Sequence, residues 1–357
     1  MNSSGDATAS AFPSGIFTSP FRPAWWLRNA HAQTLFSTFF RRPPRILRER
    51  EAVPLSDGDF VDLDWHKPSG WSDQKPLVLI VHGLSGSSES HYVLGLQQAL
   101  SLRGWASAAL NCRGASGRQN NLPRAYHAGS SDDLVQVLEF VRERYPQAPR
   151  ALVGYSLGGN MTIKLLGENP AAGLAFAGVA VSVPLLLPLC SDRMDLGFSR
   201  VYRQHFMGAL TAHWEEKMRH LEQVGNAAAA SRVREQLRRG PFRSFWHFDN
   251  DLVAPLHGFH DVHDYYQQAS SRQFLAAITT PTLVIQAHDD PFMTPAVLPS
   301  AAELSPQVHF ELCKQGGHVG FIEGGTPRYP RYYLEHRIPA FLHRQWQAIQ
   351  ASGELLG

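Results

Sequence analysis

From Leu77 onward, short runs of apolar residues alternate with longer amphipathic runs, and turns containing glycine separate them. The short runs have the length of strands, and several are rich in Val and Ile, which is typical of strands covered on both faces. Because a helix-length segment follows most of these strands, successive strands are expected to run in the same direction. The sequence therefore predicts an α/β protein with a mostly parallel sheet flanked by helices.

This alternation predicts the positions of the core elements. Six buried strands are expected at 76–83, 105–111, 150–156, 174–184, 281–290 and 307–313. Helices are expected at 91–103, 131–145, 157–168 and 333–350. A β-hairpin is expected at 51–66, with Asp57-Gly58 at its turn.

The parallel pattern is interrupted once, by about a hundred residues between Pro184 and Pro281. Part of this insertion, 210–239, is rich in residues that favour helix. We expect residues 185–280 to form a helical cap that enters after the strand ending near Pro184. The α/β core would then comprise 20–184 and 281–357, preceded by a flexible leader at 1–19.

Composition narrows the classes of protein that this chain can be. Lys and Arg number 33 against 31 Asp and Glu, a net charge of +2 that is too close to neutral for a general nucleic-acid binder. The three cysteines are widely spaced and indicate neither a disulfide framework nor a zinc site. The N-terminus lacks the pattern of a secretory signal, and the most apolar stretch, Gly173 to Cys190, contains two prolines. A soluble, cytoplasmic protein is expected.

Gly154-Tyr155-Ser156-Leu157-Gly158 fits the pattern G-x-S-x-G, and it lies between a predicted strand and a predicted helix. A serine on such a tight turn is forced into an unfavourable backbone conformation that lifts its hydroxyl out of the sheet edge. The Leu157 N–H, at the start of the helix, could stabilise a developing oxyanion. Ser156 is therefore the candidate nucleophile.

A serine hydroxyl is a poor nucleophile at neutral pH and needs a histidine base that a carboxylate orients. In G-x-S-x-G enzymes the acid and then the histidine follow the serine. Here the apolar run PTLVIQA of the fifth predicted strand is followed directly by His288-Asp289-Asp290, and the sixth strand is followed by a Gly-Gly turn and His318. We assign His318 as the base and Asp290 as the acid, in preference to Asp289, because Asp290 lies further past the strand.

Other polar groups are not expected to react with the substrate or to bind a metal. The loop after the first buried strand is expected to supply a second oxyanion donor, the Leu84 N–H, while His82 is expected to be a buried residue that binds the loop backbone. His257, His260 and His263 recur every three residues, but on a helix the third would turn away from the first two. No metal site and no cofactor are expected.

Several segments together resemble the YheT-like α/β-hydrolases over about residues 20 to 345. They are NAHAQTL at 29–35, HGLSGSSES at 82–90, NCRGASG at 111–117, NLPRAYH at 121–127, GYSLGGN at 154–160, DDPFMTP at 289–295 and GGHVGF at 316–321. The resemblance implies a carboxylic-ester hydrolase, with animal relatives that act on acylglycerols and phospholipids. Cys112 and Ala115 depart from the Phe and Cys of the family pattern, but neither is a reacting group.

The sequence therefore predicts a serine esterase or lipase acting on short- to medium-chain acyl esters or lipids. An acyltransferase that uses the same acyl-enzyme, with an alcohol or thiol in place of water, remains an alternative. A third interpretation, a binding protein with the hydrolase fold but without turnover, would normally show a broken triad. The oligomeric state is not indicated.

The segment from Pro20 to Arg50 is basic and aromatic. It contains seven arginines and one acid, a local net charge of +6, interleaved with Trp and Phe. Such a mixture suits reversible contact with an anionic lipid surface. The alternative is that Trp25, Trp26 and Leu35 pack under the core and the arginines form a solvated face.

Overall fold

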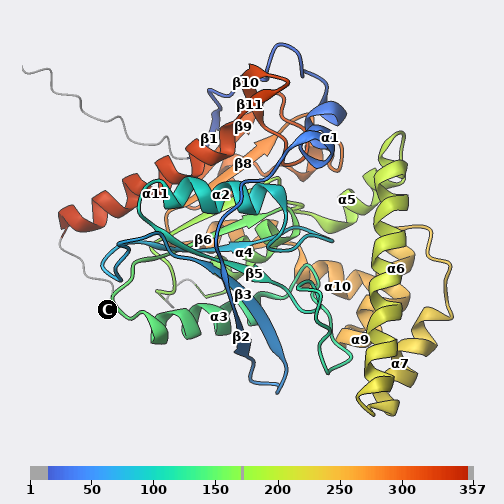
Figure 1. Ribbon diagram of the computed structural model, residues 1–357. Helices are drawn as coiled ribbons and strands as arrows, with labels where there is room; N and C mark the ends of the chain where they lie inside the picture. The colour runs from blue at the N-terminus through green and yellow to red at the C-terminus, as the bar shows by residue number, and fades with distance from the viewer. Residues whose placement is uncertain (1–14, 170–172, 353–357) are drawn as a thin grey trace, which may run out of the picture.

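The computed structural model describes residues 15–169 and 173–352, and its strands form a nine-stranded sheet covered by helices (Figure 1). The strand order is β1-β9-β8-β7-β6-β4-β5-β3-β2. Pairing is parallel from β1 to β5 in this order, whereas β3 and β2 are antiparallel. The strands are β1 Gly15–Thr18, β2 Glu49–Pro54, β3 Phe60–His66, β4 Leu77–Val81, β5 Ala106–Asn111, β6 Arg150–Tyr155, β7 Ala177–Val181, β8 Thr282–Ala287 and β9 Val308–Cys313. The predicted α/β fold with a mostly parallel sheet is confirmed.

Helices cover both faces of the sheet because its central strands are apolar on both sides. Within β4, Leu79 and Val81 pack into one hydrophobic cluster, and Val78 and Ile80 pack into another. The first cluster includes side chains of α3 and α4, and the second includes side chains of α2 and α11. These helices are α2 His91–Ser101, α3 Ser131–Arg144, α4 Leu157–Glu168 and α11 Tyr333–Ser352.

The segment between β7 and β8 is mainly helical, and its helices lie together beside the sheet (Figure 1). We refer to them as the cap helices. They are α5 Leu187–Met194, α6 Ser199–Gln223, α7 Ala227–Leu237, α8 Phe245–Phe248, the π-helix η1 Asp249–Val253, α9 Ala254–His257, α10 Val262–Ala269 and the 3₁₀ helix η2 Arg272–Ala277. The helical stretch expected at 210–239 is two helices, because Gly225 adopts φ +78° and Asn226 caps α7.

The boundary of the predicted leader is corrected. Residues 1–14 lie outside the described residues, but Gly15–Thr18 forms β1, which pairs in parallel with β9. Ser19, just after β1, donates a 2.6 Å hydrogen bond to the buried carboxylate of Glu311. A four-residue edge strand lacks a pattern of its own and is stabilised by its neighbour, which explains why the sequence did not reveal it.

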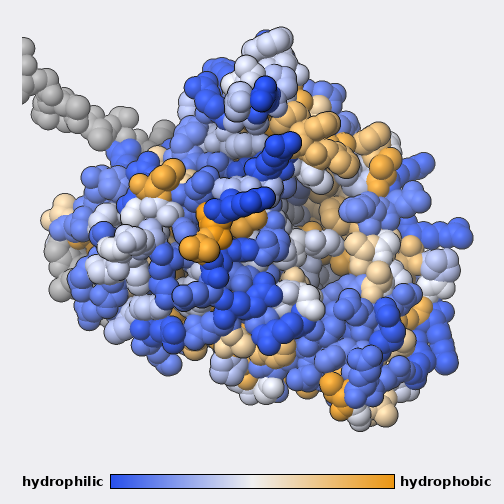
Figure 2. All heavy atoms as spheres, in the orientation of Figure 1, coloured by the Kyte–Doolittle hydropathy of each residue, from blue (hydrophilic) through white to orange (hydrophobic). Residues whose placement is uncertain are grey.

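The basic, aromatic segment contains α1, Ala30–Phe40, and its aromatic residues divide into two groups. Trp26 packs against Phe36 and donates a hydrogen bond to the Gly325 carbonyl. Trp25, by contrast, is 76% exposed, so it does not pack under the core. Figure 2 shows apolar side chains gathered over α1, where Phe39 and Phe40 are also largely exposed.

The arginines of this segment do not all form a solvated face. Arg41 pairs with Glu335, Arg48 with Glu89, and Arg50 with Asp64. Arg22, Arg28, Arg42 and Arg45 are exposed, and so is the paired Arg50.

Outside the large sheet, β10 (Ile322–Thr326) and β11 (Tyr329–Tyr332) form an antiparallel hairpin. Two short 3₁₀ helices, η3 Pro295–Val297 and η4 Ala301–Glu303, connect β8 to β9. Within 15–169 and 173–352, no helix is both long and apolar enough to cross a membrane.

Candidate active site

Ser156 occupies the turn between β6 and α4, where the sequence placed it. Its backbone adopts φ +53° and ψ −118°, a conformation that residues with side chains rarely take. The neighbouring strand stabilises this backbone conformation, because the Ser156 N–H donates a 2.8 Å hydrogen bond to the Val181 carbonyl. The predicted unfavourable turn is confirmed.

Glycines surround this turn because no side chain would fit. A Cβ added at Gly154 would lie 2.2 Å from the Gly158 carbonyl oxygen, and one at Gly158 would lie 2.5 Å from the His82 carbonyl oxygen. In the loop after β4, a Cβ at Gly83 would lie 3.0 Å from the Ser156 Cβ. The two predicted oxyanion loops therefore contact each other through their backbones.

Side chains from three separate loops form one chain of hydrogen bonds. The Ser156 hydroxyl lies 2.9 Å from His318 Nε2, and His318 Nδ1 lies 2.8 Å from Asp290 Oδ2. Because the Asp290 carboxylate accepts the bond, Nδ1 carries the proton and Nε2 presents its lone pair to the serine hydroxyl. All three loops follow the carboxyl ends of parallel strands, which meet at one edge of the sheet.

The two neighbouring aspartates have different partners. Asp290 is buried, bonds His318 through Oδ2, and accepts the Phe292 N–H through Oδ1 at 2.9 Å. Asp289 instead accepts the Gly317 N–H at 3.0 Å, and burial raises its pKa above the usual range. The structure thus brings Asp290, the preferred residue, against the histidine, while Asp289 supports the backbone of the histidine loop.

The α1 segment also supports the histidine loop, a role that its sequence motif does not indicate. The His318 N–H donates to Thr34 Oγ1 at 2.9 Å, and the Gln33 side chain accepts the Ile322 N–H at 2.8 Å. A Cβ at Gly317 would lie 2.4 Å from the Ala30 carbonyl oxygen. The sequence marks the N-A-H-A-Q-T segment only as part of the family resemblance, and its contact with the Gly-Gly-His loop arises from the tertiary fold.

Both predicted oxyanion donors lie at the wall of the same pocket as Ser156. Among the described residues, neither the Leu84 N–H nor the Leu157 N–H has a protein acceptor. The loop that carries Leu84 is held from both sides, since the Gly83 N–H donates to the Tyr92 hydroxyl and the Ser85 N–H donates to the Tyr126 hydroxyl. These tyrosines were not anticipated from the sequence.

His82 has the buried role that was predicted. Its Nδ1 lies 2.7 Å from the Gly83 carbonyl, and its Nε2 accepts the Cys112 N–H at 3.2 Å. Complete burial lowers its pKa to about 4, so the ring stays neutral and fastens the loop rather than exchanging protons.

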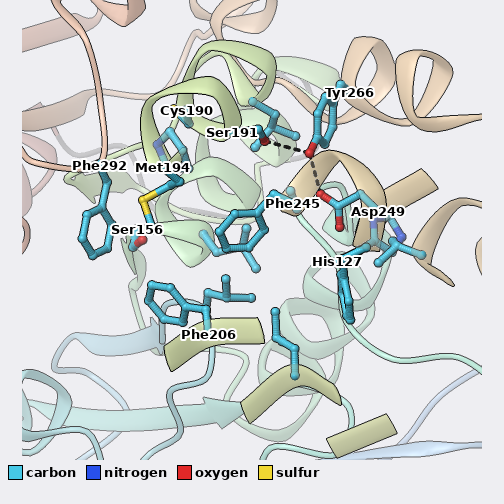
Figure 3. Close-up of a pocket in the computed structure, with 18 of the residues that line it drawn as sticks. His127, Ser156, Cys190, Ser191, Met194, Phe206, Phe245, Asp249, Tyr266 and Phe292 are labelled. Atoms are coloured by element: carbon cyan, nitrogen blue, oxygen red, sulfur yellow. Dashed lines mark hydrogen bonds between the residues drawn. The ribbon is translucent and has the colours of Figure 1, made fainter. Parts of the chain in front are cut away.

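An apolar pocket opens beside Ser156 and is walled mainly by the cap helices (Figure 3). Phe206 comes from α6 and Phe245 from α8, while Phe292 comes from the loop after β8. The Phe292 ring stacks on the His318 imidazole with ring centroids 4.1 Å apart. The site therefore joins a polar chain of hydrogen bonds to a cavity suited to an aliphatic chain.

The three regularly spaced histidines have separate surroundings. His257 is partly buried between the carbonyls of Val253 and Ala125, and desolvation lowers its pKa to about 4. His260 is exposed, and the His263 ring lies against Trp246. Over the part of the chain that the structure describes, no group of three His, Cys, Asp or Glu residues is placed to hold a metal ion.

A family model described as the alpha/beta hydrolase fold matches residues 76–325. YheT of Escherichia coli strain K12, which carries the name of a candidate esterase, is 38% identical over 327 residues, covering 90% of this chain and 92% of YheT. The chain therefore belongs to the α/β-hydrolase family. Within that family it falls in the YheT-like group, as its motifs predicted.

Two further proteins are similar to this chain. A mouse protein named phospholipase ABHD3 is 27% identical, over 89% of this chain and 77% of its own length. The solved structure of the Pyrococcus furiosus esterase Pf2001 superposes with a TM-score of 0.53 at 16% identity, covering 85% of this chain and 97% of the esterase. The last similarity shows a shared fold only.

Proposed function

We propose that this α/β hydrolase is a serine esterase that cleaves carboxylic esters through an acyl-enzyme on Ser156. The observation that carries the proposal is the continuous chain of hydrogen bonds from Ser156 through His318 to Asp290 beside an apolar pocket. The groups proposed as nucleophile and as orienting acid are thus each within hydrogen-bond distance of the proposed base.

In the proposed reaction, Ser156 Oγ attacks the ester carbonyl carbon while His318 Nε2 takes the hydroxyl proton. Asp290 holds the imidazole in the required tautomer and stabilises the imidazolium. The Leu84 and Leu157 amides receive the negative charge on the carbonyl oxygen. The bond to the leaving alcohol then breaks as His318 gives the proton to the alcohol oxygen. In the second half of the reaction, water deprotonated by His318 attacks the acyl carbon, which releases the acid and restores Ser156.

The relatives and the pocket support esters of short- to medium-chain acids or lipids as substrates. YheT is named for an esterase and the mouse relative for a phospholipase. The pocket is lined mostly by aliphatic and aromatic side chains, which favour an acyl chain over a charged substrate. No step of the proposed reaction requires a cofactor.

A fluorophosphonate probe, which labels activated serines, tests the proposal directly. We expect labelling of the wild type and of the control Ser352→Ala, which changes an exposed serine in α11, but not of Ser156→Ala. Hydrolysis of p-nitrophenyl esters of increasing chain length then defines the substrate, and added alcohol reveals any acyl transfer. Labelling that persists without Ser156, or the absence of ester turnover by a labelled protein, would overturn the proposal.

A further inference from the structure

Three polar side chains meet in the cap wall of the pocket, and the proposed reaction does not use them. Ser191 comes from α5, Asp249 from η1 and Tyr266 from α10. The Tyr266 hydroxyl donates to Asp249 Oδ2 at 2.6 Å, and Ser191 Oγ lies 2.7 Å from the same phenol oxygen. We call these residues the polar trio. In Figure 3, Asp249 and Tyr266 lie across the pocket from Ser156, and Phe245 lies between Ser156 and Asp249.

The Asp249 carboxyl group lies in the wall of the pocket, and the residue is partly buried. Burial raises the pKa of Asp249 to about 7, which means that much of it is protonated near neutral pH. Among the described residues, the Asp249 side chain makes one hydrogen bond, through Oδ2 to Tyr266. The other oxygen, Oδ1, is therefore available to a group inside the pocket.

The remaining pocket wall favours a neutral polar group over an ion. Apart from Asp249, no described residue that lines the pocket is acidic, and none is Lys or Arg. Burial lowers the pKa of His213 to about 4 and the pKa of His127 well below its usual value, so both rings are neutral. A carboxylate would lose its water without gaining a cation. A hydroxyl group, which donates and accepts, matches Asp249 Oδ1 and the Ser191 hydroxyl.

We propose that the polar trio is a specificity site for an acyl chain that carries a hydroxyl group at a distance from its ester bond. The inference rests on the proposed ester hydrolysis and names its substrate class, hydroxylated aliphatic esters. The chain extends from Ser156 past Phe206 and Phe245, and its hydroxyl bonds to Asp249. An unsubstituted chain of the same length would leave the polar trio facing methylene groups, which costs binding.

The polar trio also joins three cap helices, so a purely structural role must be separated from recognition. A structural role predicts that its loss lowers activity on all esters alike. Recognition predicts a change in the ratio of kcat/KM between a hydroxylated ester and its plain counterpart. This ratio does not depend on how much of a variant is folded.

The test uses p-nitrophenyl esters of straight-chain acids of roughly four to twelve carbons and their terminally hydroxylated counterparts, with Ser156→Ala providing the background rate. Because the polar trio lies at a fixed place relative to Ser156, the wild-type ratio should peak at one chain length. At that length Asp249→Leu should lower the ratio about tenfold, the effect of one net hydrogen bond to a buried group. The matched control is Asp251→Asn, an acid of the same helix that pairs with His247 instead of lining the pocket.

Each outcome is decisive. A wild-type ratio without a peak, or a peak that persists in Asp249→Leu, overturns the specificity site even if esters are cleaved. Failure of the wild type to hydrolyse either series overturns the proposed function itself. The wild-type comparison holds whether or not the leucine variant folds.

Discussion

The turns that carry Ser156 and His318 differ from the cap helices in how much space surrounds their backbones. A Cβ at Gly154 would lie 2.2 Å from a carbonyl oxygen, and one at Gly317 would lie 2.4 Å from another. In the cap, a Cβ added at Gly197, Gly208 or Gly258 would meet nothing within 4 Å. The core site is held by close backbone contact, whereas open space surrounds these three cap glycines, of which only Gly208 lacks a positive φ.

The proposed catalytic groups, which lie in the core, and the proposed substrate-binding wall, which lies in the cap, are positioned in different ways. In the core, the hydrogen-bonded groups follow strand ends whose positions the sheet determines. In the cap, the pocket wall is a set of side chains from several helices that face one cavity. We therefore expect substitutions in the core turns to change the rate of every ester, and substitutions in the cap to change which ester is preferred.

The largest effects should come from the core. Ser156→Ala should lower kcat by about 10⁴ to 10⁶ while leaving the fold intact, because it removes the nucleophile but only one oxygen atom from the turn. His318→Ala should be nearly as damaging. Ester hydrolysis and circular dichroism measure the two consequences, and Ser156→Ala activity above a tenth of the wild type would refute the assignment.

The aspartates provide a sharper test within the core. Asp290→Asn should lower kcat by roughly 10⁴, since an amide cannot hold the imidazole tautomer or stabilise its cation. Asp289→Asn should cost much less, because an amide oxygen can still accept the Gly317 N–H. Steady-state kinetics of both variants decide the matter, and the reverse ranking would move the acid to Asp289.

Thr34 is predicted to be a positioning residue that acts through the backbone of His318. Thr34→Val removes the acceptor of the His318 N–H and should lower kcat by roughly tenfold with little change in KM. Thr34→Ser keeps the hydroxyl and should restore the rate. Equal losses in both variants would mean that the packing of Thr34, rather than its hydrogen bond, is what counts.

In the cap, Asp249 should influence stability in a pH-dependent way. Its folded pKa is about 7 against an ordinary value of 3.8, so between these values the folded protein holds a proton that the unfolded chain has released. The free energy of unfolding that this group contributes therefore falls as pH rises through that window. Asn stays neutral throughout.

The melting temperature of Asp249→Asn relative to the wild type should accordingly be higher at pH of about 8 than at pH of about 5. Thermal unfolding at the two pH values measures the difference. Asp251→Asn serves as the control, and a difference for Asp249→Asn that did not change with pH would show that its carboxyl group keeps an ordinary pKa.

The smallest expected effect concerns α1, which lies on the core side. We propose that its exposed Phe39 and Phe40, with the exposed arginines around it, make reversible contact with anionic lipid surfaces. Phe39→Ser with Phe40→Ser should reduce co-sedimentation with anionic vesicles at low salt by several-fold. Val224→Ser, an exposed apolar residue after α6, should not. Equal binding to neutral and anionic vesicles would contradict the proposal.

The core was predictable because its signals are local. Each central strand is a short apolar run, and α4 begins directly after the Ser156 turn, as the G-x-S-x-G pattern requires. Weaker segments escaped prediction. β1 is four residues long, and the β10–β11 hairpin contains the glycine-rich run IEGGT, so neither shows a hydrophobic period. Such elements are defined by the neighbour that pairs with them.

The sequence alone determined the order of the strands along the chain, the strained turn at Ser156, and the acid-then-histidine order of the residues that follow it, because these depend on short-range pattern and on chain direction. Tertiary structure decided which aspartate meets His318, that Thr34 lies beneath the histidine loop, and that Asp249 lies in the wall of the pocket. These contacts join residues far apart in the chain. They arise only when the sheet and the cap are packed, since burial and hydrogen-bond partners are properties of the folded whole.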